Sequence, residues 1–137
     1  MLLTVDYFIS LSSLGFLSPD GICHSFDDRA NGYGRGEGFG VLIVKPLHAA
    51  IQDGDTIRAV IRATRSNQNG RTNLAQPSKE MQMQLIDDVY RNAQLDMSLT
   101  NYFEAHGTGT AIGDPLEAMA IGNTFGPKRP TGHPLLM

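Results

Sequence analysis

Five glycines occupy every second position of the stretch ANGYGRGEGFG, at residues 32, 34, 36, 38 and 40. Because the side chains of an extended chain alternate between two faces, an extended conformation here would leave one face as bare backbone. A bare face lets another element of the fold approach closely. The Gly-x-Gly-x-x-Gly spacing of a dinucleotide-binding loop is absent, so the pattern favours close backbone packing over the cradling of a ligand.

Strand-like and helix-like segments alternate after these glycines. Residues 40–47 are apolar on both faces, residues 56–64 alternate apolar and polar side chains, and residues 101–106 form another short apolar run. Helices are expected over residues 48–54, 78–95 and 114–126, and the last three residues look like the start of a further strand. This order predicts an α/β fold in which helices cover a sheet.

The expected helices have recognisable ends. Gly54 is a typical helix stop, and Ser78 is a candidate N-cap. Asp114 can cap the last helix, and Glu117 completes the spacing of a capping box. Along the middle helix, an apolar stripe is expected to face the core, and it consists of Met81, Leu85, Ile86, Val89 and Ala93.

Composition and charge exclude several classes of function. The 137 residues suit one domain, and a net charge of −3 without a Lys/Arg run argues against nucleic-acid binding. The single cysteine cannot form an internal disulfide, and the four histidines show no metal-binding spacing. The apolar opening lacks a basic start and is interrupted by Asp6, which disfavours a signal peptide, and no apolar run approaches the ~18 residues of a membrane span. We therefore expect a cytoplasmic protein with no membrane partner.

The stretch YFEAHGTGTAIGDPLE, residues 102–117, carries the candidate site. His106 ends an apolar strand, and ligands of open α/β sheets gather at the carboxyl ends of strands. Gly107 and Gly109 let a substrate approach the backbone, while Thr108 and Thr110 offer hydroxyls at alternate positions. A histidine there could donate to a carbonyl oxygen or shuttle a proton. The simpler alternative is a glycine-rich turn whose histidine is satisfied by the backbone.

Several neighbouring residues have both a chemical and a structural interpretation. Asp114 opens a helix within reach of the turn, and Glu104 could orient His106 or be solvated. Glu117 could act as an acid or base, but its capping-box position explains it without chemistry.

The remaining histidines and the cysteine are weaker candidates. Cys23 and His24 are adjacent and would point to opposite faces of an extended chain, so they are a poor nucleophile–base pair. We expect Cys23 to be a small buried residue, and His48 and His133 to lie at the surface.

Four blocks together resemble the middle of a β-ketoacyl synthase domain of a type I polyketide synthase, most closely the iterative synthases of filamentous fungi. They are FLSPDGICHSFDDRANGYGRGEGFG, DTIRAVIRATRSNQNGRT, YFEAHGTGT and GDPLEAMAIG. The resemblance implies part of a thiolase-like fold, in which two similar α/β halves pack together and the domain forms a homodimer. Residues 1–55 or so would end the N-terminal half, and residues 56–137 would begin the C-terminal half.

The resemblance also implies an activity, decarboxylative Claisen condensation in polyketide biosynthesis. An acyl group and a malonyl-type thioester react, and the extender is presented on the phosphopantetheine arm of an acyl carrier domain, with no cofactor bound directly by the synthase. His106 resembles the first of the family's two catalytic histidines. Thr108 and Thr110 match the threonines that hydrogen-bond the pantetheine arm.

Two departures from the family pattern shape the expected function. The family's nucleophilic cysteine lies in a motif upstream of these residues, and its second histidine lies in a downstream motif. The chain therefore looks like an internal fragment that is inactive alone. The alternative is a non-catalytic module that docks a carrier domain or pairs with a synthase subunit. A thiolase is disfavoured by the combination of HGTGT with GDPLE.

Overall fold

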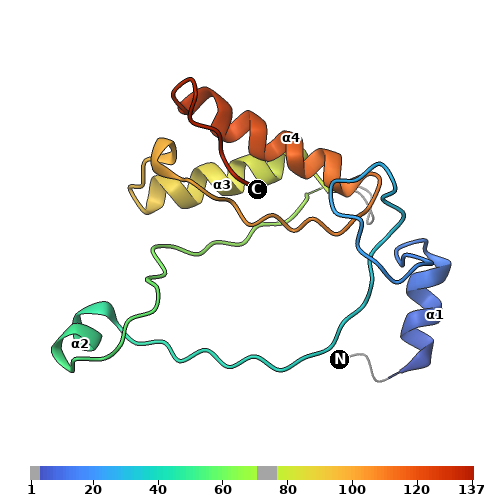
Figure 1. Ribbon diagram of the computed structural model, residues 1–137, viewed down its shortest axis with the longest axis horizontal. Helices are drawn as coiled ribbons and strands as arrows, with labels where there is room; N and C mark the ends of the chain where they lie inside the picture. The colour runs from blue at the N-terminus through green and yellow to red at the C-terminus, as the bar shows by residue number, and fades with distance from the viewer. Residues whose placement is uncertain (1–3, 71–76) are drawn as a thin grey trace.

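The computed structural model describes residues 4–70 and 77–137. The helices of these residues are α1 (Val5–Ser13), α2 (Leu47–Gln52), α3 (Lys79–Asn92) and α4 (Gly113–Phe125), with short 3-10 turns at η1 (Met97–Leu99) and η2 (Gly126–Lys128) (Figure 1). The three predicted helices are confirmed as α2, α3 and α4, whereas α1 was not predicted. No helix in this described part of the chain is long and apolar enough to cross a membrane.

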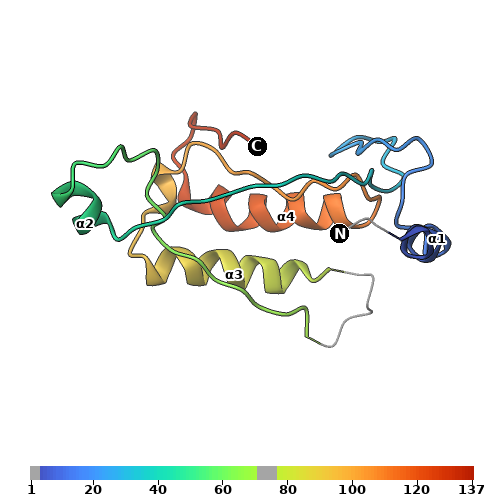
Figure 2. The same ribbon diagram turned by 90° about the horizontal axis from the view of Figure 1, so that it is seen from below.

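The core lies where α3 and α4 run side by side (Figure 2). Phe125 is 1% exposed and is buried with Met97 and Ile121. Its ring meets the rings of Tyr90 and Phe103 edge-on, with centroids 5.5 and 5.6 Å away. Full burial of one such side chain contributes about 1.5–3 kcal/mol to folding. Because Phe103 belongs to the segment that leads to His106, this core also anchors the candidate site.

The predicted apolar stripe of α3 is only partly correct. Ile86 packs against the buried cluster as expected, and Tyr90 joins it from the next turn. Met81, Leu85 and Val89 are half-buried and lie outside that cluster. No residue of α3 is fully buried, because α4 is the helix that packs on it and covers one side.

The predicted strands are extended but mostly unpaired. Within residues 4–70 and 77–137, β-pairing is limited to two isolated parallel bridges, Leu17 with Tyr33 and Tyr102 with Leu136. A strand requires a second backbone about 4.8 Å away. The extended segment that leads into α2 and the one that follows it take separate paths, so they do not lie side by side along their length (Figure 1). Ile43, in the first of these segments, is 96% exposed. The prediction that residues 40–47 form a strand buried on both sides is therefore wrong for this structure.

The last apolar residues do begin to pair, as their sequence predicts. The Phe103 N–H donates to the Leu136 carbonyl at 2.9 Å, and the Leu136 N–H donates to the Asn101 carbonyl at 3.0 Å. The extended segment that carries His106 is thus tied to the carboxyl-terminal residues.

The alternating glycines allow close packing at two of their five positions. A Cβ at Gly32 would lie 2.6 Å from the Leu17 carbonyl carbon, and a Cβ at Gly34 would overlap the Gly21 carbonyl oxygen. The same atom at residues 36, 38 and 40 would meet nothing within 4 Å. Close packing is therefore confirmed for the first two glycines and is wrong for the last three.

Two predicted helix ends and two surface histidines are confirmed. Gly54 follows α2 with a φ of +70°, and the Ser78 hydroxyl caps α3 by accepting from the Met81 N–H at 3.2 Å. His48 and His133 are exposed. Residues 71–76, which precede the helix expected from residue 78, lie outside the described residues.

Candidate functional site

The candidate site is a cleft of about 540 Å³ beside the turn that joins residues 101–106 to α4. His106 is exposed in this cleft, and Thr108 and Thr110 line it as half-buried residues. Apolar side chains also line the cleft, and they include Leu14, Phe16 and Ile112. The cleft thus combines one imidazole, two hydroxyls and an apolar side.

Glu117 holds the first part of the turn through its backbone. One carboxylate oxygen accepts from the His106 N–H at 2.7 Å, and the other accepts from the Gly107 N–H at 2.9 Å. The predicted capping box is therefore wrong, because this carboxylate reaches the turn that precedes the helix. The start of α4 is instead held by Thr110, whose hydroxyl oxygen accepts from the Gly113 N–H at 3.2 Å.

Asp114 holds the second part of the turn and is 3% exposed. Its carboxylate accepts from the Gly109 N–H at 3.1 Å and from the Thr110 N–H at 3.2 Å. A third donor, the Phe26 N–H, lies 2.8 Å away. Asp114 is thus not the N-cap, since Ile112 occupies that position. It lies instead in the first turn of α4, from which its side chain reaches back to the preceding turn.

Both glycines of the turn are required by its shape. Gly107 has a φ of +50° and Gly109 a φ of +79°, values that side chains rarely adopt. A Cβ at Gly109 would lie 2.7 Å from the His24 backbone nitrogen. Segment 23–32 therefore packs directly behind the turn, and the Gly32 N–H donates to the Gly109 carbonyl at 3.0 Å.

Sequence reasoning missed Ser25 and Phe26 as parts of this site. The Ser25 hydroxyl donates to the Gly107 carbonyl, and the Phe26 N–H donates to Asp114. These pairs lie 82 and 88 residues apart in the chain. No local pattern in the sequence signals such distant backbone contacts, and only the fold reveals them.

Glu104 accepts a hydrogen bond from within its own extended segment, residues 101–106. It is exposed and accepts from the Tyr102 hydroxyl. This bond, together with burial and the negative charge of Glu104, raises the pKa of Tyr102 above its ordinary value. The suggested role of Glu104 in orienting His106 stays a prediction.

Cys23 lies outside the His106 cleft. It is exposed, contrary to the expectation of burial, and its sulfur accepts from the Gly34 N–H at 3.2 Å. The neighbouring His24 imidazole lies 3.6 Å from the Asp20 carboxylate. In the described ranges, no group of three or more His, Cys, Asp or Glu side chains could hold a metal ion.

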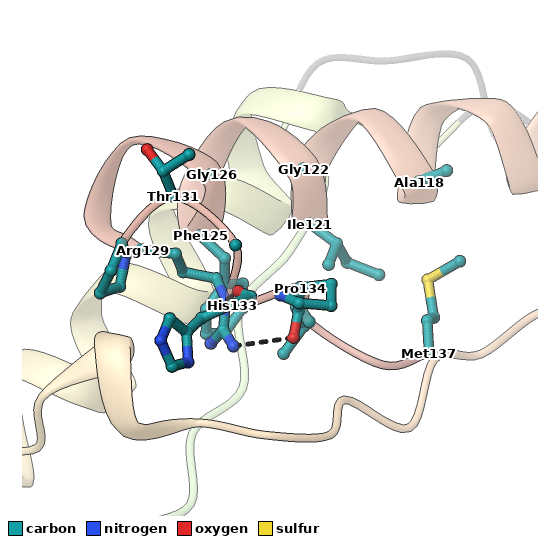
Figure 3. Close-up of a pocket in the computed structure, with 13 residues that line it drawn as sticks. Ala118, Ile121, Gly122, Phe125, Gly126, Arg129, Thr131, His133, Pro134 and Met137 are labelled. Atoms are coloured by element: carbon teal, nitrogen blue, oxygen red, sulfur yellow. Dashed lines mark hydrogen bonds between the residues drawn. The ribbon is translucent and has the colours of Figure 1, made fainter.

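A second groove, of about 620 Å³, lies between α4 and the carboxyl-terminal residues (Figure 3). The arginine that lines it, Arg129, is already hydrogen-bonded to backbone carbonyls. The Arg129 guanidinium donates to the carbonyls of His133 at 2.8 Å and Pro134 at 2.9 Å, and also to the Thr100 carbonyl. Arg129 thus fastens the carboxyl-terminal segment to the fold, and we place the functional site at the His106 cleft.

Comparison with known proteins identifies the class. Residues 58–137 match the family model for the β-ketoacyl synthase C-terminal domain, and residues 1–50 match the model for the N-terminal domain. The chain therefore belongs to the β-ketoacyl synthase family.

The relatives in that family are polyketide synthases. The chain is 57% identical over 136 residues to the compactin diketide synthase mlcB of Penicillium citrinum, covering 98% of this chain and 5% of that protein. It is 51% identical over 133 residues to highly reducing polyketide synthase 40 of Fusarium mangiferae, with 96% and 5% covered. The chain thus spans about one twentieth of these relatives.

Solved ketosynthases share the backbone arrangement. The ketosynthase from module 6 of the bacillaene synthase of Bacillus subtilis 168 superposes with a TM-score of 0.89 at 41% identity, over 93% of this chain and 23% of that one. The oxazolomycin ketosynthase domain OzmH KS7 of Streptomyces albus JA3453 gives the same TM-score at 36% identity, over 96% and 23%. The predicted fold class, an α/β arrangement that is part of the thiolase-like fold, is confirmed by these matches.

Proposed function

We propose that this chain forms one wall of the condensing site of a polyketide ketosynthase, an acyltransferase that joins acyl and malonyl-type thioesters by decarboxylative Claisen condensation. The observation that carries this proposal is the cleft in which His106, Thr108 and Thr110 are accessible together. The boundary between the two halves of the domain is proposed near residue 55, and the interval between the two family matches supports it.

His106 would stabilise the negative charge that develops on the thioester carbonyl oxygen of the extender. Glu117 holds only its backbone N–H, and the imidazole makes no hydrogen bond to the described residues, so the ring is available for the substrate. A fixed hydrogen-bond donor aimed at a developing oxyanion typically lowers the activation free energy by about 3–4 kcal/mol. The exposed position of the ring in the cleft fits this role.

The two threonines would hold the phosphopantetheine arm of an acyl carrier domain. The Thr110 oxygen accepts from Gly113, so its hydroxyl hydrogen is free to be donated to an amide carbonyl of the arm. The Thr108 oxygen lies 3.5 Å from that of Thr110, which lets the pair serve neighbouring polar groups of one extended ligand. The apolar residues that line the same cleft suit the methyl groups of this arm.

We further propose that the 137 residues do not condense thioesters by themselves. Covalent catalysis needs a nucleophile within reach of the reacting carbonyl. Cys23 is the only cysteine in the sequence, and it does not line the His106 cleft. An attacking thiolate would come from other sequence of a homodimeric synthase. Incubation with an acyl thioester should leave the mass of the chain unchanged, and a specific acyl adduct on Cys23 would contradict this.

Binding of free pantetheine tests the role of the threonines. Titration into ¹⁵N-labelled chain should shift the amide signals of residues 106–110. Thr108→Val and Thr110→Val should weaken the binding, and Thr131→Val, an exposed threonine of the carboxyl-terminal loop, should not. Equal affinity of all three variants and the unchanged chain would overturn the proposed site.

A second candidate function, a module that pairs with another synthase polypeptide, is favoured by the apolar extended segments around α2. Val41, Leu42 and Ile43 are each at least 88% exposed. Unpaired strand edges with apolar side chains favour association with a second backbone. A soluble, monomeric chain that melts cooperatively by itself and forms a stable complex with a ketosynthase polypeptide would support this function, and a chain that is insoluble alone would count against it.

A further inference from the structure

Phe26 adopts a backbone conformation that is unusual for a bulky side chain. Its φ is +55°, in the left-handed region that non-glycine residues seldom occupy. Gln94 is the other non-glycine residue with positive φ in the described ranges, and it simply ends α3. Strained residues of this kind persist where the surroundings over-determine them, and they cluster at functional sites. The contacts of Phe26 therefore indicate why this backbone conformation is maintained.

Two hydrogen bonds fix Phe26 against the turn that carries His106. The Phe26 N–H donates to the buried Asp114 carboxylate at 2.8 Å. The hydroxyl of the preceding residue, Ser25, donates to the Gly107 carbonyl. Asp114 also accepts from Gly109, so the strained residue and the turn share one acceptor.

The Phe26 ring occupies the space directly behind the turn. A Cβ placed on Gly107 would lie 3.0 Å from Cε2 of that ring. Gly107 follows His106 and has a φ of +50°, so the partly exposed Phe26 ring packs against the residue next to the one that carries the imidazole. The ring and the Glu117 carboxylate hold the His106–Gly107 segment through separate contacts.

We propose that Phe26 is a positioning residue for His106. Its left-handed backbone, imposed by Asp114, places the ring against Gly107, and the ring in turn restricts the orientation of the imidazole in the cleft. The packing stands on the structure alone, and its catalytic value rests on the proposed function of His106.

Phe26→Gly separates positioning from general stability. Glycine adopts a φ of +55° without strain, so the backbone and its bond to Asp114 can remain while the ring is lost. We expect the chain to stay folded, the His106 imidazole signals to shift and broaden in NMR spectra of histidine-labelled chain, and diethyl pyrocarbonate to modify His106 faster. The signals of His48 and His133, which lie far from Phe26 in the chain, should not change.

Phe39→Gly is the matched control, because Phe39 is a fully exposed ring in an extended segment. It should leave His106 unchanged. Phe26→Leu keeps an apolar side chain, so it should fold and should give a smaller change at His106 than Phe26→Gly does, with no change at His48 or His133. His106 signals and reactivity that stay constant in Phe26→Gly would overturn the proposal. If Phe26→Gly does not fold, Phe26→Leu decides, since either no change at His106 or an equal change at His106, His48 and His133 would overturn it. The assay contains no thioester, so its failure is distinct from failure of the proposed pantetheine site.

Discussion

Asp114 provides the sharpest test of how the turn is built. The variant is Asp114→Asn, which keeps the size of the side chain and one acceptor oxygen but turns an amide nitrogen toward N–H donors. Three backbone N–H groups, those of Phe26, Gly109 and Thr110, depend on this carboxylate. At ~1.5 kcal/mol for each bond to a charged group, the set contributes about 4–5 kcal/mol.

Asn should lose roughly half of that contribution, about 2–3 kcal/mol, whereas Asp114→Ala should lose most of it. A folded domain is stable by only about 5–15 kcal/mol, so either loss is readily measured. The measurement is urea unfolding followed by circular dichroism at neutral pH. Asp6→Asn, an exposed carboxylate of α1, is the control and should change stability by less than ~0.5 kcal/mol.

Amide hydrogen exchange adds spatial detail to the same test. In Asp114→Asn the amides of Gly109 and Thr110 should exchange faster than those in the middle of α4. If Asp114→Asn is no less stable than Asp6→Asn, or if those amides stay protected, the buried carboxylate does not hold the turn and the reasoning fails.

Three further predictions address other contacts. Gly34→Ala should destabilise the chain strongly, because its Cβ would overlap a backbone carbonyl, while Gly36→Ala should be neutral in the same thermal melts. Glu117→Gln should speed the hydrogen exchange of the His106 and Gly107 amides, which the Glu117 carboxylate holds. Because the effect is local, exchange of the amides of α3 should stay unchanged. Hydrogen bonds from Arg29 hold the pKa of Asp27 well below its ordinary value of 3.8. This interaction therefore stabilises the folded chain fully at pH values above 3.8, and the stabilisation is lost as the pH falls through the depressed pKa of Asp27. Arg29→Ala should return the Asp27 pKa toward 3.8 in a carboxyl ¹³C titration, and an unchanged midpoint would contradict this ion pair.

Helices α2, α3 and α4 could be predicted from the sequence because their signals are local, whereas α1 was not predicted. Ser78 caps α3 through a residue three positions away, and Gly54 ends α2 within its own turn. The carboxylates of α4 show the limit of such reasoning. Asp114 and Glu117 have capping-box spacing, yet both side chains turn to backbone N–H groups of the preceding turn, which compete for the same oxygens.

The sequence could not predict whether its apolar segments form paired β-strands. Residues 40–47 are apolar enough for a buried strand, but a strand is defined by its neighbour, and no second backbone pairs with them within the described residues. Helices α3 and α4 pack on each other, and both lie within the described residues. The same distinction explains Phe26, since its conformation depends on a carboxylate 88 residues away.

The backbone of the turn that carries His106 is coupled to the hydrophobic core through a short chain of contacts. The backbone N–H groups of the turn are held by two carboxylates of α4, and α4 is held in place by the burial of Phe125. The extended segment that leads to His106 packs on the same ring through Phe103. Both ends of the turn therefore depend on one buried side chain. A substitution that shrinks Phe125 should disturb the cleft from a distance, even though Phe125 does not line it.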